Sequence, residues 1–326
     1  MAEGLIYLKD VTISGNVASN AADRTDRDGG GFYFTGTGNR LELDNVIIEN
    51  NTTIDDGGGF YWGGSASIGN FKDVIIRSNT TLNPTAGTQD SDGGGFGIAG
   101  TRNTLTFTKS HIGQIGAGNI SENDAGGFKM EGRYNTLNLI DASIAGNSTL
   151  NGTGGGFWIV NDTETVNISG DSRIVNNTTP LAGNHGGGFR NDGVVNITGT
   201  AVNPIEIQNN HAGTATTGNN DVIGGGFFNT SNGILNLTDV IISGNTAYAR
   251  GGGFFNSGGG QVFISSSTPG TFKSTISGNA ALVDSDGTRA DLTKGFGGGF
   301  YNSGANSLVK LTDTNITLNT AADYAG

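Results

Sequence analysis

Two short sequence signals alternate along the whole chain and define a repeat. The first is Gly-Gly followed by an aromatic residue, at Phe32, Phe60, Phe96, Phe128, Phe157, Phe189, Phe227, Phe254 and Phe300. The second is Ile-x-x-Asn, at Ile13/Asn16, Ile48/Asn51, Ile76/Asn79, Ile120/Asn123, Ile144/Asn147, Ile174/Asn177, Ile207/Asn210, Ile242/Asn245, Ile276/Asn279 and Ile316/Asn319. Such alternation indicates a repeat protein whose units stack on their neighbours.

A pair of apolar residues two positions apart lies between these signals. Clear copies are Leu41/Leu43, Leu137/Leu139, Leu235/Leu237 and Val309/Leu311. In each of them the two residues stand seven and five positions before the Ile of the next Ile-x-x-Asn signal. Period two is the spacing of a β-strand that buries one face. The pattern predicts an all-β fold, a right-handed single-stranded parallel β-helix (solenoid) of about ten three-strand coils, because parallel crossovers are nearly always right-handed.

The polar positions of the repeat have structural explanations. We expect the Asn of each Ile-x-x-Asn signal to lie at a turn, where its amide can bond backbone groups of its own and adjoining coils and so form a ladder. The triple glycines are predicted to permit positive φ and a close approach between coils. Neither signal therefore needs a functional explanation.

Composition narrows the class of protein. Gly contributes 59 of the 326 residues, Pro only 4 and Cys none, which fits a tightly turned β-solenoid without disulfides or thiolate metal sites. The net charge of −12 predicts no nucleic-acid partner and no binding to an anionic membrane surface. No apolar run approaches the roughly 18 residues of a membrane span, so we expect no direct membrane insertion of this segment.

The segment from Ile242 to Phe254, ISGNTAYARGGGF, places both signals close together. It resembles the repeats of polymorphic outer-membrane proteins and related autotransporter-type adhesins, whose passengers carry a Gly-Gly-Ala-Ile-like box and a Phe-x-x-Asn box on a pectin-lyase-like parallel β-helix. The aromatic and aliphatic residues are exchanged here. The resemblance covers nearly all of the chain and implies a secreted or bacterial cell-surface stalk used in cell adhesion, with a cell-surface protein or glycan as partner. Self-association through solenoid ends or edges stays open.

Both ends of the chain fall inside a repeat. Ile6 and Leu8 stand seven and five residues before Ile13, and the final AADYAG matches the TAYARG that precedes Gly252. We therefore expect residues 1–326 to form a single β-helix domain that is cut in mid-coil at both ends, with any export signal or membrane anchor outside it.

The residue after each glycine-box Phe is predicted to face outward, because side chains alternate along a strand. These positions hold Tyr33, Tyr61, Gly97, Lys129, Trp158, Arg190, Phe228, Phe255 and Tyr301. Six of them are aromatic, namely Tyr33, Tyr61, Trp158, Phe228, Phe255 and Tyr301, and they are the candidate ligand-binding residues, as a platform for sugar rings or partner side chains. The alternative is that neighbouring loops fold back and cover them. The longest such loops, residues 17–28, 80–92, 211–223 and 280–296, are predicted to leave from one corner of the coil.

Acidic clusters in these loops raise the question of a metal. The candidate calcium ligands are Asp284, Asp286 and Asp291, because Asp-Ser-Asp-Gly resembles the start of a calcium loop. The full spacing and the terminal Glu are missing, and solvated acidic turns are an alternative. Further acidic groups are Asp23/Asp26/Asp28 and Asp90/Asp92. No other cofactor is expected.

Two other functions remain beside an adhesin. Many parallel β-helices cleave polysaccharides, which needs paired carboxylates on neighbouring coils or carboxylates with a well-placed base. The sequence shows only Asp55/Asp56 as an adjacent pair, so we expect no enzyme activity and no catalytic residue. A purely structural spacer or filament segment is the third alternative.

Overall fold

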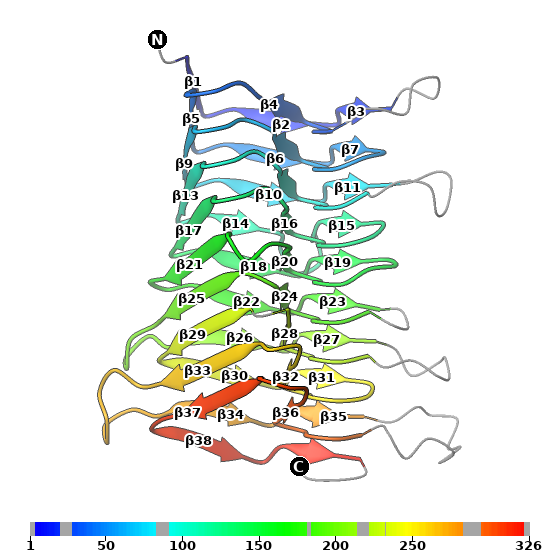
Figure 1. Ribbon diagram of the computed structural model, residues 1–326. Helices are drawn as coiled ribbons and strands as arrows, with labels where there is room; N and C mark the ends of the chain where they lie inside the picture. Colours follow the sequence, from blue (N-terminus) through cyan, green and yellow to red (C-terminus); the bar gives the residue numbers. More distant parts are fainter. Residues whose placement is uncertain are drawn as a thin grey trace.

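The computed structural model describes residues 4–19, 28–82, 91–180, 184–213, 222–231, 233–282 and 295–322. This part of the chain is all β and forms four parallel sheets, A to D, with strands from successive coils as neighbours. Figure 1 shows the coils stacked along one axis from the N-terminal coil at the top. The predicted parallel β-helix of about ten coils is confirmed. In the ranges described, no helix is long and apolar enough to cross a membrane.

Sheet A contains the pairs of apolar residues that stand two positions apart in the sequence. Leu41 and Leu43 are both buried, and the residues between such pairs face outward. In-register pairing places each pair on its counterpart, as for Leu105 on Leu137. The strands are β1 (Leu5–Lys9), β5 (Arg40–Asp44), β9 (Ile68–Lys72), β13 (Thr104–Thr108), β17 (Thr136–Ile140), β21 (Thr165–Ser169), β25 (Val194–Thr198), β29 (Ile234–Thr238), β33 (Gln261–Ser265) and β37 (Leu308–Leu311).

Sheet B contains the Ile of the second signal. Ile48, Ile76 and Ile144 are buried and lie in one register along the sheet. Its strands are β2 (Thr12–Ser14), β6 (Ile47–Glu49), β10 (Ile75–Arg77), β14 (His111–Ile112), β18 (Ser143–Ala145), β22 (Arg173–Val175), β26 (Ile205–Gln208), β30 (Val240–Ser243), β34 (Ser274–Ser277) and β38 (Thr314–Thr317).

Sheet C gives each coil a fourth, two-residue strand that the sequence pattern does not predict. Its residues are mostly Thr, Ser and Ala, which give no apolar period. The strands are β3 (Val17–Ala18), β7 (Thr52–Thr53), β11 (Thr80–Thr81), β15 (Ile120–Ser121), β19 (Ser148–Thr149), β23 (Thr178–Thr179), β27 (His211–Ala212), β31 (Thr246–Ala247), β35 (Ala280–Ala281) and β39 (Thr320–Ala321).

Sheet D begins at the glycine-box Phe, whose rings stack along the axis. Rings of adjacent coils, such as Phe128, Phe157 and Phe189, lie 4.6 to 4.7 Å apart and within 3° of parallel. The strands are β4 (Phe32–Phe34), β8 (Phe60–Trp62), β12 (Phe96–Ile98), β16 (Phe128–Met130), β20 (Phe157–Ile159), β24 (Phe189–Asn191), β28 (Phe227–Asn229), β32 (Phe254–Asn256) and β36 (Phe300–Asn302).

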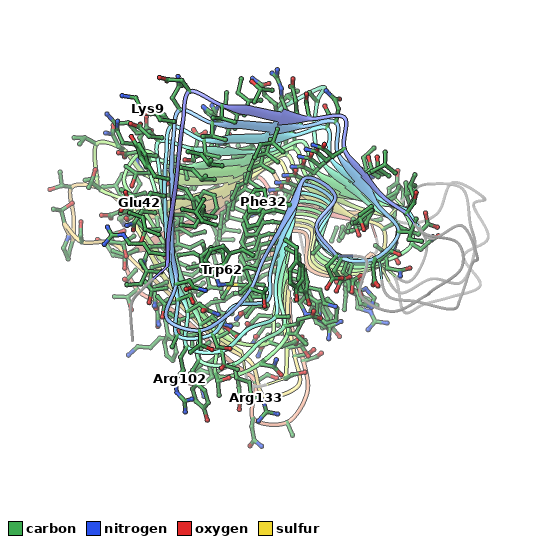
Figure 2. All side chains as sticks on the ribbon, turned by 90° about the horizontal axis from the view of Figure 1, so that it is seen from above. Lys9, Phe32, Glu42, Trp62, Arg102 and Arg133 are labelled. Carbon is green, nitrogen blue, oxygen red and sulfur yellow. The ribbon has the colours of Figure 1, made fainter. Side chains whose placement is uncertain are left out.

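The apolar core lies between sheets A, B and D. Figure 2 looks down the axis from the N-terminal end and shows Phe32 and Trp62 inside this prism and Lys9 and Glu42 on its outside. From Lys9 the chain passes through sheets B, C and D and returns through Glu42, running clockwise as it moves away from the viewer. The solenoid is therefore right-handed, as predicted.

A ladder of asparagines fixes the corner between sheets B and C. Asn147 Nδ2 donates to Asn177 Oδ1 at 3.0 Å and to the carbonyl oxygen of Ile112 at 2.9 Å. The same pattern joins Asn16, Asn51, Asn79, Asn119, Asn147, Asn177, Asn210, Asn245, Asn279 and Asn319. The ladder satisfies buried amides at every coil, which confirms its predicted structural role.

In the fourth coil the predicted pair Ile120/Asn123 is wrong. Ile112 occupies the buried Ile position, and Asn119 carries the ladder. Ile120 instead opens β15 in sheet C, with 36% of its surface exposed. The reason is that the connection between β14 and β15, residues 113–119, is longer than its counterparts, so the Ile and the Asn no longer stand three positions apart.

The triple glycines serve the two purposes predicted for them. Gly154 has a φ of +72°, where side chains are disfavoured. A Cβ on Gly155 would lie 2.3 Å from the carbonyl oxygen of Gly187 in the next coil. The boxes are thus required by the backbone path and by coil-to-coil contact.

Most of the length variation lies between sheets C and D, at one corner of the coil. The connections are residues 19–31, 54–59, 82–95, 122–127, 150–156, 180–188, 213–226, 248–253 and 282–299. Longer connections elsewhere are residues 113–119, 199–204 and 266–273. The variable corner adjoins the start of sheet D and therefore the outer face of that sheet.

Candidate functional site

The outer row of sheet D consists of the residues that follow each glycine-box Phe, from Tyr33 to Tyr301. Pairing in register places them one above another, as for Lys129, Trp158 and Arg190. Aromatic rings and cationic groups contact one another from Lys129 to Tyr301, and Tyr33 stacks on Tyr61. Gly97 separates these two runs. The structure thus brings the six predicted aromatic residues into one line, although their exposure differs widely.

The C-terminal part of the row is covered. Phe228 and Phe255 are 7% and 4% exposed and pack with Ile223 and Ala249 from the segments that precede the glycine boxes. Tyr301, which is partly exposed, stacks on Phe255 at 5.3 Å. For Phe228 and Phe255 the alternative holds: neighbouring segments fold back over the rings, so neither ring offers a free face.

The middle of the row is a cation–π stack around Trp158. The Arg190 guanidinium lies 4.5 Å from the ring centroid and the Lys129 ammonium 5.5 Å from it. The Trp158 Nε1 donates to Asp192 Oδ2 at 2.8 Å, and Arg190 Nε donates to the same oxygen at 3.1 Å. These contacts hold the partly exposed indole in one orientation.

The N-terminal part of the row presents Tyr33, which is 49% exposed and stacks on Tyr61 at 5.6 Å. Tyr61 is 8% exposed, and its ring lies against Gly97, where a Cβ would come within 2.7 Å of it. The Tyr61 hydroxyl donates to Glu131 at 3.2 Å. Burial and the Glu131 carboxylate raise the pKa of Tyr61, so this phenol stays protonated.

A stack of four carboxylates, the carboxylate ladder, lies beside this part of the row and consists of Asp28, Asp56, Asp92 and Asp124. Each Oδ1 accepts from the backbone N–H of the equivalent residue in the next coil, at 2.9 Å for Asp56 to Asp92 and 2.8 Å for Asp92 to Asp124. Asp28, Asp56 and Asp92 directly precede a triple-glycine box, and Asp124 precedes Ala125, which takes the place of the first glycine in the Phe128 copy. The sequence indicated Asp28 and Asp92 as members of loop clusters and Asp56 as part of the adjacent pair Asp55/Asp56, and it did not single out Asp124. The alignment of the four carboxylates was not predicted.

Lys129 lies in the outward-facing register of sheet D, as expected, but it is covered and neutralises part of this ladder. Its side chain is 8% exposed and forms ion pairs with Asp92 and with Glu131, the latter at 2.8 Å. Burial lowers the pKa of Lys129, but the carboxylates outweigh this and raise it above its ordinary value. Burial raises the pKa of Asp92 to about 6 and, with the Asp92 charge, raises that of Asp56. The cluster is therefore a buried ionic site in which Lys129 offsets part of the carboxylate charge and burial favours the protonated acids.

The calcium prediction concerns a segment outside the described ranges. Asp284, Asp286 and Asp291 all lie outside the described residues, and calcium binding there stays a prediction. Within the described ranges, Asp28, Asp55 and Asp56 each place a carboxylate oxygen within 4.8 Å of the others, close enough to share a metal ion. The backbone N–H of Asp56 donates to Asp28 at 3.4 Å, so a structural contact already joins two of them.

Comparisons with known proteins add no information on function. No protein-family model matches the chain, and neither a curated protein nor a solved structure matches it. The resemblance of the repeat to autotransporter-type adhesins therefore stays a prediction that rests on the sequence signals.

Proposed function

We propose that this chain is a binding stalk of an extracellular, surface-displayed adhesin, which holds a cell-surface protein or glycan along the outer row of sheet D. The observation that supports this most is the position of the exposed rings. Tyr33, Trp158 and Tyr301 stay at least partly exposed on the row that adjoins the variable corner of the coil. Rigid rings beside segments of variable length suit recognition.

The stacked interior supports such a role because it keeps these rings at fixed spacings. Trp158 is held by Arg190 and Asp192, and Tyr33 by Tyr61. Side chains that are ordered before binding lose little conformational entropy when a ligand arrives. A spacer would not need partly exposed aromatic residues on one line.

The experiment compares binding of the parent chain and of the double variant Tyr33→Ala with Trp158→Ala. The probes are an array of defined glycans and an array of purified extracellular-matrix proteins. We expect the variant to lose at least tenfold in affinity for the probe that the parent binds, because truncated aromatic anchors typically cost 2 kcal/mol or more.

Tyr134→Ala is the matched control. Tyr134 is 56% exposed but lies at the corner between sheets D and A, away from the outer row. Circular dichroism first establishes that all variants keep their β-structure. If the double variant binds as tightly as the Tyr134 control, the outer row is not the binding surface, and a spacer becomes the better explanation.

Polysaccharide cleavage is a second candidate, which the carboxylate ladder favours. Asp56 and Asp92 are neighbouring carboxylates on adjacent coils with raised pKa values, the arrangement that acid–base cleavage uses. They are only 8% and 2% exposed, so the residues around them would have to move before a substrate could reach either carboxylate. Incubating polysaccharides with the parent chain and with Asp56→Asn, and measuring new reducing ends, separates this activity from binding alone.

A further inference from the structure

A hollow opens on the outer face of sheet B, on a side of the solenoid that the proposed function does not use. Outward-facing His111, Ser143 and Arg173 follow one another in register on β14, β18 and β22. The short Ser143 side chain between two long ones leaves a gap. Two adjoining cavities of about 420 and 280 Å³ share these three residues.

The floor of the hollow is formed by small residues that face outward and are still buried. Ser143 and Ala145 flank the inward-facing Ile144, yet only 5% and 4% of their surfaces are exposed. Gln114 and Ile115 belong to the long connection, residues 113–119, and line the second cavity. The equivalent connection covers only two residues in the other coils, such as 146–147. The hollow is thus specific to this part of the repeat.

Cationic groups line the hollow in a chain whose net charge is −12. Arg173 Nε donates to Ser143 Oγ at 3.1 Å, which aims the guanidinium along the floor. Among the described residues, neither Arg173 nor Lys109 forms an ion pair with a carboxylate. Burial and the nearby Arg173 charge lower the pKa of His111, so its imidazole is neutral near pH 7. Donors without strong partners are therefore available to an anionic group.

Two carboxylates also line the first cavity and limit which anions fit. They belong to Asp141 and Asp171, and Asp141 Oδ1 accepts from the Asp171 backbone N–H at 2.9 Å. They would repel phosphate or sulfate groups, whose charge is high and spread over several oxygens. They can accept hydrogen bonds from hydroxyl groups. The hollow thus combines donors for one carboxylate with acceptors for neutral hydroxyls.

We propose that this hollow binds a sugar acid, with its carboxylate between Arg173 and the Lys109/His111 pair and its hydroxyl groups toward Asp141 and Asp171. Arg is suited to a carboxylate because its planar guanidinium can donate two parallel hydrogen bonds. The exposed Ile115 supplies apolar surface for the C–H face of the ring. The volume suits one or two sugar rings.

The histidines provide a local readout of binding. The chain has only three, His111, His185 and His211, so their imidazole NMR signals can be followed separately. The probes are glucuronate, glucose and acetate. Glucuronate has both the hydroxyl groups and the carboxylate, glucose has only the hydroxyl groups, and acetate has only the carboxylate. We expect glucuronate to shift the His111 signals saturably and to raise the pKa of His111, because a bound carboxylate favours the imidazolium form. The signals of the other two histidines should not move.

Variants test the assignment further. R173Q should weaken the glucuronate response about tenfold or more, because it removes a charge-assisted contact. R133Q is the matched control, since Arg133 is an exposed arginine at the corner between sheets D and A, which Figure 2 shows at the far end of the coil from sheet B. It should respond as the parent does.

Three results would overturn the proposal. The first is that glucuronate does not shift the His111 signals. The second is that acetate shifts them as much as glucuronate does, which would indicate a site for any anion. The third is that R173Q responds to glucuronate as the parent does. The Tyr33→Ala/Trp158→Ala variant should keep the full His111 response, because those residues lie on another sheet. The sugar-acid site and the proposed adhesin surface can therefore fail independently.

Discussion

The two halves of the outer face of sheet D share one backbone and differ in chemistry. In the N-terminal half, Asp56 and Asp92 surround Lys129, while the equivalent layer in the C-terminal half packs Ile223 against Phe228 and Phe255. The glycine-box Phe rings on the inner face of sheet D stack in the same way in both halves. The interior ladders therefore fix the fold, and the outer layer can be either ionic or apolar provided that its polar groups have hydrogen-bond or ionic partners.

The largest effect is expected from breaking the ionic half. Lys129→Met should lower the free energy of unfolding by about 3–5 kcal/mol near neutral pH, because it leaves buried carboxylates without their cation. In the variant the folded pKa of Asp92 stays above its unfolded value, so the native state gains stability as pH falls toward about 5, where protonation removes the unpaired charge. Urea denaturation of parent and variant at several pH values checks this. A constant difference across pH would contradict the ionic assignment.

The matching change in the apolar half is Phe255→Ala. We expect a loss of about 3 kcal/mol, at the low end for a buried Phe because the site lies at the edge of the fold, and no dependence on pH. The same denaturation series provides the measurement. If the loss of stability in Phe255→Ala changed with pH as that in Lys129→Met does, the outer layer of the C-terminal half would not be apolar and that of the N-terminal half ionic.

Glu164 offers a smaller test, at the corner between β20 and β21. Its side chain is buried and accepts from the Asn135 backbone N–H and Nδ2, both at 3.1 Å. Burial raises the pKa of Glu164 to about 7, so its charge costs stability above that pH and protonation relieves the cost as pH falls. Glu164→Gln should therefore stabilise the fold by up to about 3 kcal/mol near pH 8 and by little near pH 5. A destabilised variant near pH 8 would show that the carboxylate is needed as an acceptor.

The smallest effect is expected for Tyr33→Ala, in the exposed part of the row. Tyr33 is 49% exposed, so the free energy of unfolding should change by less than about 0.5 kcal/mol. Thermal melting of this variant beside the parent is sufficient. A loss comparable to that of Phe255→Ala would mean that Tyr33 is a structural ring, which would weaken its role in the proposed binding surface.

The recurring signals predicted the fold because every ladder residue contacts its own equivalent in the next coil. Phe157 stacks on Phe189, and Asn147 bonds Asn177, so a repeat in the sequence becomes a repeat of contacts. The prediction was wrong in the fourth coil, where the connection 113–119 moved Asn119 away from Ile112. The apolar pair Leu105/Phe107, seven and five residues before Ile112, was the signal that could have located it.

The coil, its interior ladders and the corner that varies most could therefore be predicted from the sequence, since they follow from local spacing and from contacts between identical residues. Which outward side chains are covered became known from the three-dimensional structure. Lys129 meets Asp92, and Tyr61 meets Glu131, at non-equivalent positions 37 and 70 residues apart. Such contacts depend on how segments fold back over the sheet and on how far long side chains extend across coils. A periodic pattern does not encode either quantity.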